Sequence, residues 1–226
     1  MAGHIDCYMD TSSFYSFLCL VFLLKHQKLL ASHDVSVEFI PVFLGGINVG
    51  SGNKPPWTLP AKAAYGEFEM KRAMAYHNVP GIERPSFFPV LTVLPQRALC
   101  YIKDTFPRST FEQAWIAFFR ASWIPRQLDL SKPDVLETML RESKLFSAQE
   151  VDAICAAAKT QEWKDRLTAN TKTALDLGAF GAPWLMVRNA EGKVEPFFGS
   201  DRFYFIWEYL GLPWKDFELL PRRAKL

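Results

Sequence analysis

The sequence predicts an α/β fold in which the two ends of the chain build one domain around a central helical region. Near the N-terminus, residues 4–9 and 35–43 have the composition of strands, and the apolar residues 14–30 between them predict a helix. Near the C-terminus, residues 184–198 contain two short apolar runs around a turn, and a helix is expected over residues 202–210. A strand–helix–strand unit and a hairpin–helix unit together favour an α/β domain.

The region between these two units is predicted to be all-helical. Residues 110–122 place apolar side chains at helical spacing, and Ser147 and Glu150 have the spacing of a capping box. Prolines interrupt the pattern and separate the expected helices from one another. These prolines are Pro80, Pro85, Pro89, Pro107, Pro125 and Pro133.

Composition narrows the classes of function. The 226 residues are 49% hydrophobic and 22% charged, which is ordinary for a soluble enzyme. The net charge is +2, and no basic run is interleaved with aromatic residues, so nucleic acid is not an expected partner. The 19 Phe and 7 Trp predict strongly aromatic cores or pockets.

The cysteines argue against a redox or metal centre. They are far apart, without the two-residue spacing of a redox dithiol or a zinc site, and the four histidines are scattered. We therefore expect reduced, mostly buried thiols and no metal. The apolar run of residues 14–24 has no basic leader and is too short for a membrane span, so we expect neither a signal peptide nor a membrane partner. The cysteines are Cys7, Cys19, Cys100 and Cys155.

Ser13 and Pro183 mark two candidate sites, and each has two interpretations. Ser13 ends a polar cluster before the first helix, so it is either a plain helix cap or a hydroxyl placed where the helix partial charge favours an anion. Pro183 opens a predicted strand, where the missing ladder donor can leave a neighbouring backbone group free for a ligand or can serve only to start the strand.

Glycine and proline content predicts a long loop over residues 45–60, and long ordered loops often serve sites. Lys62, which follows it, has the character of a solvated helix lysine. Ser200 and Asp201 have the character of an N-cap and an acidic first-turn residue before the last helix.

The order of these motifs resembles the kappa-class glutathione transferases. The matching segments are GAFGAP at residues 178–183, FGSDR at 198–202, GNKPP at 52–56 and DTSSFYSF at 10–17. In the last segment the family serine is followed by Pro-Tyr-Ser-Trp or a close variant. Here Phe14 replaces the proline and Phe17 the tryptophan.

This resemblance implies a thioredoxin-like domain of residues 1–60 and 172–226, with an inserted all-α domain of residues 61–171. It also implies a homodimer and a glutathione site in which Ser13 is the catalytic serine. The glutathione-contacting residues that it implies are Ser13, Tyr15, Asn53, Lys62, Ala182, a cis Pro183, Ser200 and Asp201.

In that site the backbone of Ala182 would bind the cysteinyl part of glutathione, and Asn53 its peptide portion. Lys62 would face a carboxylate. The amides near Ser200 would hold the γ-glutamyl carboxylate, and Asp201 would pair with the neighbouring ammonium group.

The activity implied is conjugation of glutathione to small hydrophobic electrophiles, as in detoxification, with peroxide reduction as a further activity. Glutathione is then a co-substrate, and no cofactor is expected. Two alternatives stay open: a glutathione-dependent isomerase of the 2-hydroxychromene-2-carboxylate type, and a non-catalytic glutathione-binding protein, which is favoured if Phe14 distorts the turn at Ser13.

The last three residues, Ala224, Lys225 and Leu226, resemble the Ser-Lys-Leu peroxisomal signal. Several kappa-class members end in a similar tripeptide. We therefore expect recognition by a peroxisomal import receptor, with the cytoplasm and the mitochondrion as alternative locations.

Overall fold

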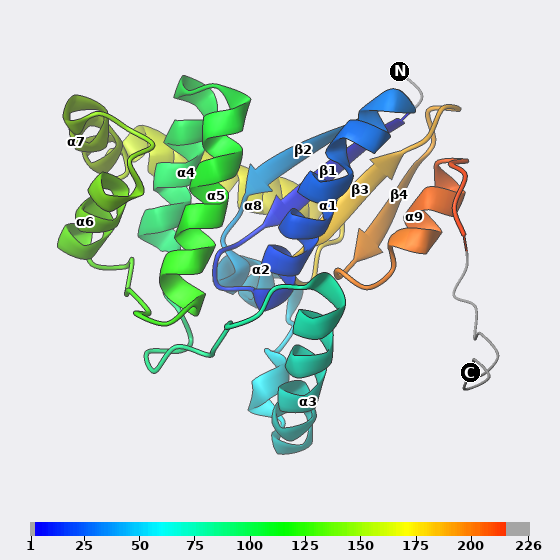
Figure 1. Cartoon of the computed structure of the whole chain (residues 1–226), viewed down its shortest axis with the longest axis horizontal. Helices are drawn as coiled ribbons and strands as arrows, with labels where there is room; N and C mark the ends of the chain where they lie inside the picture. The colour runs from blue at the N-terminus through cyan, green and yellow to red at the C-terminus, as the bar shows by residue number, and fades with distance from the viewer. Residues whose placement is uncertain (1–2, 216–226) are drawn as a thin grey trace, which may run out of the picture.

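A computed structural model describes residues 3–215, so the tripeptide of residues 224–226 lies outside the described part of the chain. One four-stranded sheet, in the order β2-β1-β3-β4, is surrounded by helices (Figure 1). The strands are β1 (Gly3–Met9), β2 (Val35–Pro41), β3 (Trp184–Arg188) and β4 (Val194–Phe198). The helices are α1 (Phe14–Ser32), α2 (Leu44–Ser51), the 3-10 helix η1 (Pro56–Thr58), α3 (Pro60–His77), α4 (Val93–Thr105), α5 (Arg108–Trp123), α6 (Pro133–Ser143), α7 (Ala148–Ala157), α8 (Gln161–Asp176) and α9 (Phe203–Tyr209).

The sheet is mixed. Strand β1 pairs in parallel with β2 and antiparallel with β3, which in turn pairs antiparallel with β4. Because side chains alternate along a strand, Ile5 and Cys7 of β1 face one side, where they share a buried cluster with residues of α1. Tyr8 faces the other side and packs with Ile47 of α2 and Ala174 of α8. The strand–helix–strand unit and the hairpin predicted from the sequence are confirmed.

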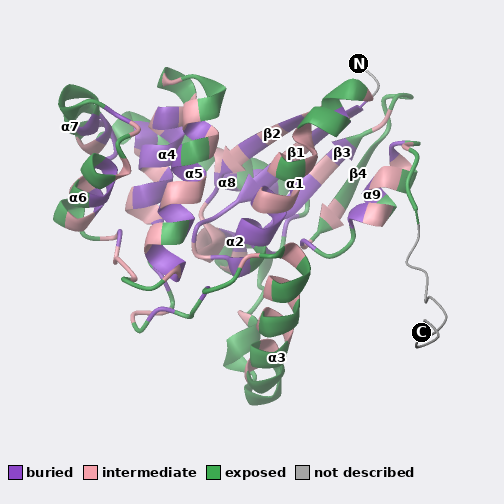
Figure 2. Ribbon diagram, in the orientation of Figure 1, coloured by how far each residue is buried: buried purple, intermediate pink, exposed green. Residues whose placement is uncertain are grey.

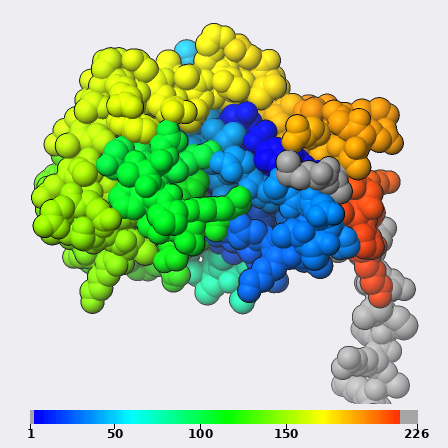
Figure 3. Space-filling view, turned by 90° about the horizontal axis from the view of Figure 1, so that it is seen from above, coloured from blue at the N-terminus to red at the C-terminus, as the bar shows by residue number. Residues whose placement is uncertain are grey.

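Helices cover both faces of the sheet. Helices α1 and α9 lie on one face and α8 on the other, and the view from above shows α8 and the N-terminal segments as separate layers (Figures 1 and 3). Phe22 of α1 stacks on Phe203 of α9, with ring centroids 4.0 Å apart. Among the described residues, α1 alone is long and apolar enough to cross a membrane. The core helix of a soluble protein can have the same length and composition, so these two features do not identify a membrane span.

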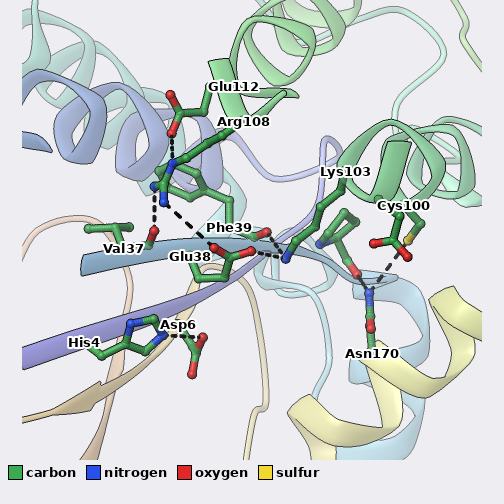
Figure 4. Close-up of polar contacts among 12 residues, drawn as sticks. His4, Asp6, Val37, Glu38, Phe39, Cys100, Lys103, Arg108, Glu112 and Asn170 are labelled. Carbon is green, nitrogen blue, oxygen red and sulfur yellow. Dashed lines mark hydrogen bonds and ion pairs between the residues drawn. The ribbon is translucent and has the colours of Figure 1, made fainter. Parts of the chain in front are cut away.

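The helical region packs beside the edge strand β2. Three side chains from its helices donate to backbone carbonyl oxygens of β2, and the Glu38 carboxylate pairs with two of these donors (Figure 4). The edge is therefore closed to another strand. The bonds run from Lys103 to Phe39 (2.9 Å), from Arg108 to Val37 (2.6 Å) and from Asn170 to Pro41 (3.0 Å).

The all-helical character of the middle region is confirmed, as is the capping box of Ser147 and Glu150. The domain boundary at residues 171 and 172 stays a prediction. Helix α8 runs without a break across it, and one buried cluster joins residues of the sheet to residues of α4–α7.

The prediction of a loop over residues 45–60 is wrong, because α2 occupies its first half and η1 lies in its second. The first amide of α2, that of Leu44, donates to the Asp10 carboxylate at 2.6 Å. The glycines allow close packing on α8: a Cβ at Gly50 would lie 2.5 Å from the Leu175 side chain, and one at Gly46 3.2 Å from Thr171. Tertiary packing thus overrides the low helix propensity of glycine.

Candidate functional site

The turn between β1 and α1 places Ser13 at the start of a helix. The Ser13 backbone is extended, and its amide donates to the Asp10 carbonyl at 3.0 Å. Its side-chain oxygen accepts from the Ser16 amide at 3.1 Å, so Ser13 is the N-cap of α1, as predicted. The next amides, of Phe14 and Tyr15, lie in the first turn, where no intrahelical acceptor exists.

The Ser13 hydroxyl also donates to the carbonyl oxygen of Ala182 at 2.8 Å, across 169 residues of sequence. The register explains this contact. Because Tyr8 lies opposite Trp184 in the antiparallel pair β1–β3, the end of β1 lies beside the start of β3. The Ala182–Pro183 peptide bond is cis, as the family resemblance implied. Both Ser13 and Ala182 are buried.

Phe14 does not distort this turn. Helix α1 begins at Phe14, and the Phe14 ring is buried with its centroid 6.4 Å from that of Trp123. The Trp123 indole donates to the Thr11 carbonyl at 2.7 Å and ties the turn to α5. The ring that replaces the family proline is therefore absorbed into the core, and the condition that favoured a non-catalytic protein is not met.

Asn53 reaches the same place from the segment after α2. Its amide nitrogen donates to the Phe180 carbonyl at 2.7 Å, in the loop that leads to the cis proline. That loop is compact, because a Cβ at Gly181 would lie 2.8 Å from the Phe198 ring. The structure thus brings together Ser13, Asn53, Ala182 and Pro183.

Tyr15 lies at the border of this group and is 36% exposed. Burial raises the pKa of Tyr15, and the carboxylates of Glu69 and Asp201 raise it further. Lys62 is exposed in the first turn of α3, and within residues 3–215 it makes no polar contact with the group around Ser13.

The capping roles predicted for Ser200 and Asp201 are wrong. Helix α9 begins at Phe203, and its N-cap, Arg202, makes no side-chain capping bond. The Gly199 amide donates to the Pro183 carbonyl at 3.1 Å, which extends the β3–β4 pairing by one residue. Gly199 has φ of +93°, so the chain turns away from the strand there, and the helix begins only at Phe203. Ser200 is buried, and the exposed Asp201 carboxylate lies 3.9 Å from Arg202.

His77 also lies in this region, although no sequence pattern linked it to Ser13 or to Ser200. It lies in the last turn of α3, with its ring centroid 5.7 Å from that of Phe22 on α1, and it forms a hydrogen bond with the Ser200 backbone. Burial lowers the pKa of His77, while the Ser200 bond and the Asp201 carboxylate oppose that shift. No local signal marks it, since its partners are distant in sequence.

The turn at Ser13 carries a hydroxyl at a helix N-terminus, and the segment from Ser13 to Ser16 contains no redox dithiol. Within residues 3–215 no group of three or more His, Cys, Asp or Glu side chains could hold a metal ion. The four cysteines are free; three are buried and Cys155 is half-buried. A hydroxyl donor at a helix N-terminus favours a negatively charged group.

Residues 4–211 match the family described as DSBA-like thioredoxin domain. The chain belongs to the DsbA-like thioredoxin domain family. Glutathione S-transferase kappa 1 of Caenorhabditis elegans is 29% identical over 222 residues, covering 92% of this chain and 91% of that protein. Glutathione S-transferase kappa 1 of Homo sapiens is 26% identical over 214 residues, covering 93% and 92%.

Among solved structures, a 2-hydroxychromene-2-carboxylate isomerase has a TM-score of 0.68 at 18% identity, covering 92% of this chain and 94% of that one. This likeness supports the fold. The thioredoxin-like fold and the resemblance to kappa-class transferases are confirmed. A thiol oxidoreductase of the DsbA-like fold would need Cys-x-x-Cys at the start of α1, where this chain has Ser13-Phe14-Tyr15-Ser16.

His77 predicts a specific pH dependence of stability. Its folded pKa lies below the ordinary value of 6.5, so protonation is less favourable in the folded state than in the unfolded one. The resulting stability is present above pH 6.5 and is lost as the pH falls through the lowered value. Between pH 6.5 and the lowered pKa, the free energy of unfolding measured with urea should fall more for the wild type than for His77→Gln. Parallel curves for the two proteins would contradict the assignment.

Proposed function

We propose that this chain is a glutathione transferase that conjugates reduced glutathione to small electrophiles through a thiolate stabilised by Ser13. The observation that carries the proposal is the Ser13 hydroxyl, which lies at the N-terminus of α1 and is bonded to the backbone of Ala182 beside cis Pro183. The two kappa-class relatives named above are glutathione transferases by name and align over almost the whole chain.

Ser13 acts on the ionisation of the thiol. An unperturbed cysteine thiol has a pKa of about 8.5, so a few per cent is thiolate at neutral pH. Each unit of depression corresponds to about 1.4 kcal/mol, and a hydroxyl donor together with a helix N-terminus can supply one or two units. The thiolate attacks the electrophile, the leaving group departs, and the thiol proton has gone to solvent. Ser13 is a hydrogen-bond donor throughout and forms no covalent bond.

In this proposal, glutathione replaces the Ser13 hydroxyl as the hydrogen-bonding partner of the Ala182 backbone. The cysteinyl backbone of glutathione pairs with Ala182, which releases the Ser13 hydroxyl to the sulfur. Asn53 would contact the peptide portion of glutathione, and its bond to Phe180 in the loop before Pro183 supports this assignment. Tyr15 borders the site, and the family resemblance assigns Lys62 to a carboxylate of glutathione. The backbone near Ser200 and the carboxylate of Asp201 receive the γ-glutamyl end.

The same thiolate can reduce hydroperoxides. It attacks the terminal oxygen of the peroxide, releases an alcohol and becomes a sulfenic acid, which a second glutathione converts to the disulfide with loss of water. This second activity needs no further residue, and it places the enzyme in detoxification.

Ser13→Ala should lower kcat/KM for conjugation about tenfold or more. The reason is that a hydrogen bond to a charged group contributes roughly 1.5 kcal/mol or more. The assays are conjugation of a chloronitrobenzene, reduction of a hydroperoxide and isomerisation of a chromene carboxylate. Ser32→Ala, at the exposed end of α1, is the matched control and should retain wild-type activity. A loss below about threefold in every active assay would remove the thiolate role.

A second copy of this chain is the partner that we propose for α3. The helix has 18 residues, none of them buried, and its N-terminal part projects from the rest of the fold (Figure 2). Tyr65, Phe68 and Tyr76 are each more than half exposed on it. A large exposed apolar surface of this kind marks an interaction site.

An isologous contact through α3 would centre on Phe68. Two antiparallel copies related by a twofold axis near Phe68 would place the two Phe68 rings together and remove both from water.

Phe68→Glu should therefore convert a dimer to a monomer, measured by light scattering during size-exclusion chromatography. The two added carboxylates would lie near the twofold axis, where they would repel each other and where removing them from water is costly. Leu29→Glu changes an equally exposed apolar residue on α1 and should leave the dimer intact. A monomeric wild type, or a dimer that survives Phe68→Glu, would contradict this interface.

The location that we propose is the peroxisome, through an import receptor that binds residues 224–226. The support is the Ala-Lys-Leu ending, in which alanine replaces the serine of the standard signal. A fluorescent protein fused to the N-terminus, with the tail left free, should give peroxisomal puncta. The same fusion without residues 224–226 should stay diffuse. Diffuse or mitochondrial fluorescence from the intact tail would refute the location.

A further inference from the structure

The end of β1 that carries the Ser13 turn is held by a buried polar cluster with members in the helical insert. Asp10, Thr92 and Gln96 are all fully buried. Asp10 directly follows β1, Thr92 precedes α4, and Gln96 lies in the first turn of α4. We refer to these three residues as the Asp10 clamp.

Asp10 joins three segments through one carboxylate. One oxygen accepts from the Ser12 amide at 2.8 Å, and the other accepts from the Leu44 amide at 2.6 Å and from the Thr92 hydroxyl at 3.0 Å. The carboxylate therefore fixes the turn that leads to Ser13, the start of α2 and the entry to α4. All of these partners are uncharged donors. Burial raises the pKa of Asp10, while the hydrogen bonds from Ser12, Leu44 and Thr92 lower it.

Gln96 fastens the neighbouring strand ends. Its amide nitrogen donates to the Met9 carbonyl at 2.9 Å and to the Val42 carbonyl at 2.6 Å, at the ends of β1 and β2. Thr92 and Gln96 are four residues apart and thus share a face of one helical turn. The first turn of α4 therefore holds the ends of β1 and β2, beside the turn that carries Ser13.

We infer that the Asp10 clamp is a positioning device for the Ser13 hydroxyl, by which the helical insert sets the geometry of thiolate stabilisation. This inference rests on the proposed function. The Ser13 amide donates to the Asp10 backbone carbonyl, and the Ser12 amide to the Asp10 side chain, so a shift of Asp10 displaces the hydroxyl directly. A hydrogen bond to a thiolate depends strongly on donor distance and angle.

Thr92→Val tests the clamp, because valine keeps the shape of threonine and removes the hydroxyl. In the free protein, exchange of the Ser12 and Ser13 amides should become about fivefold faster or more. In the conjugation assay, the kcat/KM profile should shift to higher pH, with about a threefold or larger loss near pH 7 and recovery where free thiol ionises anyway. Thr92→Ser keeps the hydroxyl and should restore both readouts.

Ile154→Val is the control for a general loss of stability. Ile154 is buried in α7, away from the clamp, and its truncation lowers the unfolding midpoint without touching the turn. It should change neither the exchange of Ser12 and Ser13 nor the pH profile. If Thr92→Val behaves like Ile154→Val, or if Thr92→Ser fails to rescue, the clamp is merely structural and the inference is overturned. A wild type that does not conjugate glutathione would refute the proposed function alone, because amide exchange still decides whether the clamp positions Ser13.

Discussion

The hydrogen bond from the Ser13 hydroxyl to the Ala182 carbonyl is the contact on which the architecture of the site depends. It joins the turn after β1 to the turn before β3, two segments that meet only because these strands pair antiparallel in one sheet. Each side is supported separately. The cap of α1 and the Asp10 carboxylate hold the Ser13 turn, while the cis bond at Pro183 and the contact of Asn53 with Phe180 hold the other. The backbone of Ser13 is thereby fixed by contacts that do not involve its hydroxyl proton, so its position can stay the same when the hydroxyl turns from the Ala182 carbonyl to a ligand.

The sheet stays small because both of its edges are blocked. On β2, the side chains of Lys103, Arg108 and Asn170 take up carbonyl groups that a further strand would need. On β4, the bonds at either end of the hairpin place Pro196 at an outward-facing position, where it lacks a donor. The helical insert therefore has two structural roles: its polar side chains close the β2 edge, and Thr92 and Gln96 fix the ends of β1 and β2.

Local sequence patterns correctly predicted the elements that are stabilised by contacts between residues close in sequence. Alternation and capping chemistry located β1, α1 and the hairpin, and Ser13 was placed correctly as a cap because its bond to Ser16 spans three residues. The order of motifs supplied Asn53 and cis Pro183, which composition could not. The failures all involve tertiary contacts. The glycines of α2 resemble a loop until α8 is present to pack on them. Ser200 resembles a cap, but β4 stays paired with β3 as far as Gly199, and α9 begins only at Phe203. Likewise, nothing near His77 or Asp10 in the sequence reveals partners that lie on other elements.

The most direct test of this account is the pKa of the glutathione thiol in complex with the wild-type protein, obtained from thiolate absorbance as a function of pH. A preorganised hydroxyl at a helix N-terminus should lower that pKa by about one unit or more from the value in free glutathione. A bound thiol that titrates within a few tenths of a unit of free glutathione, or a protein that does not bind glutathione at about millimolar concentration, would contradict the central role given to Ser13.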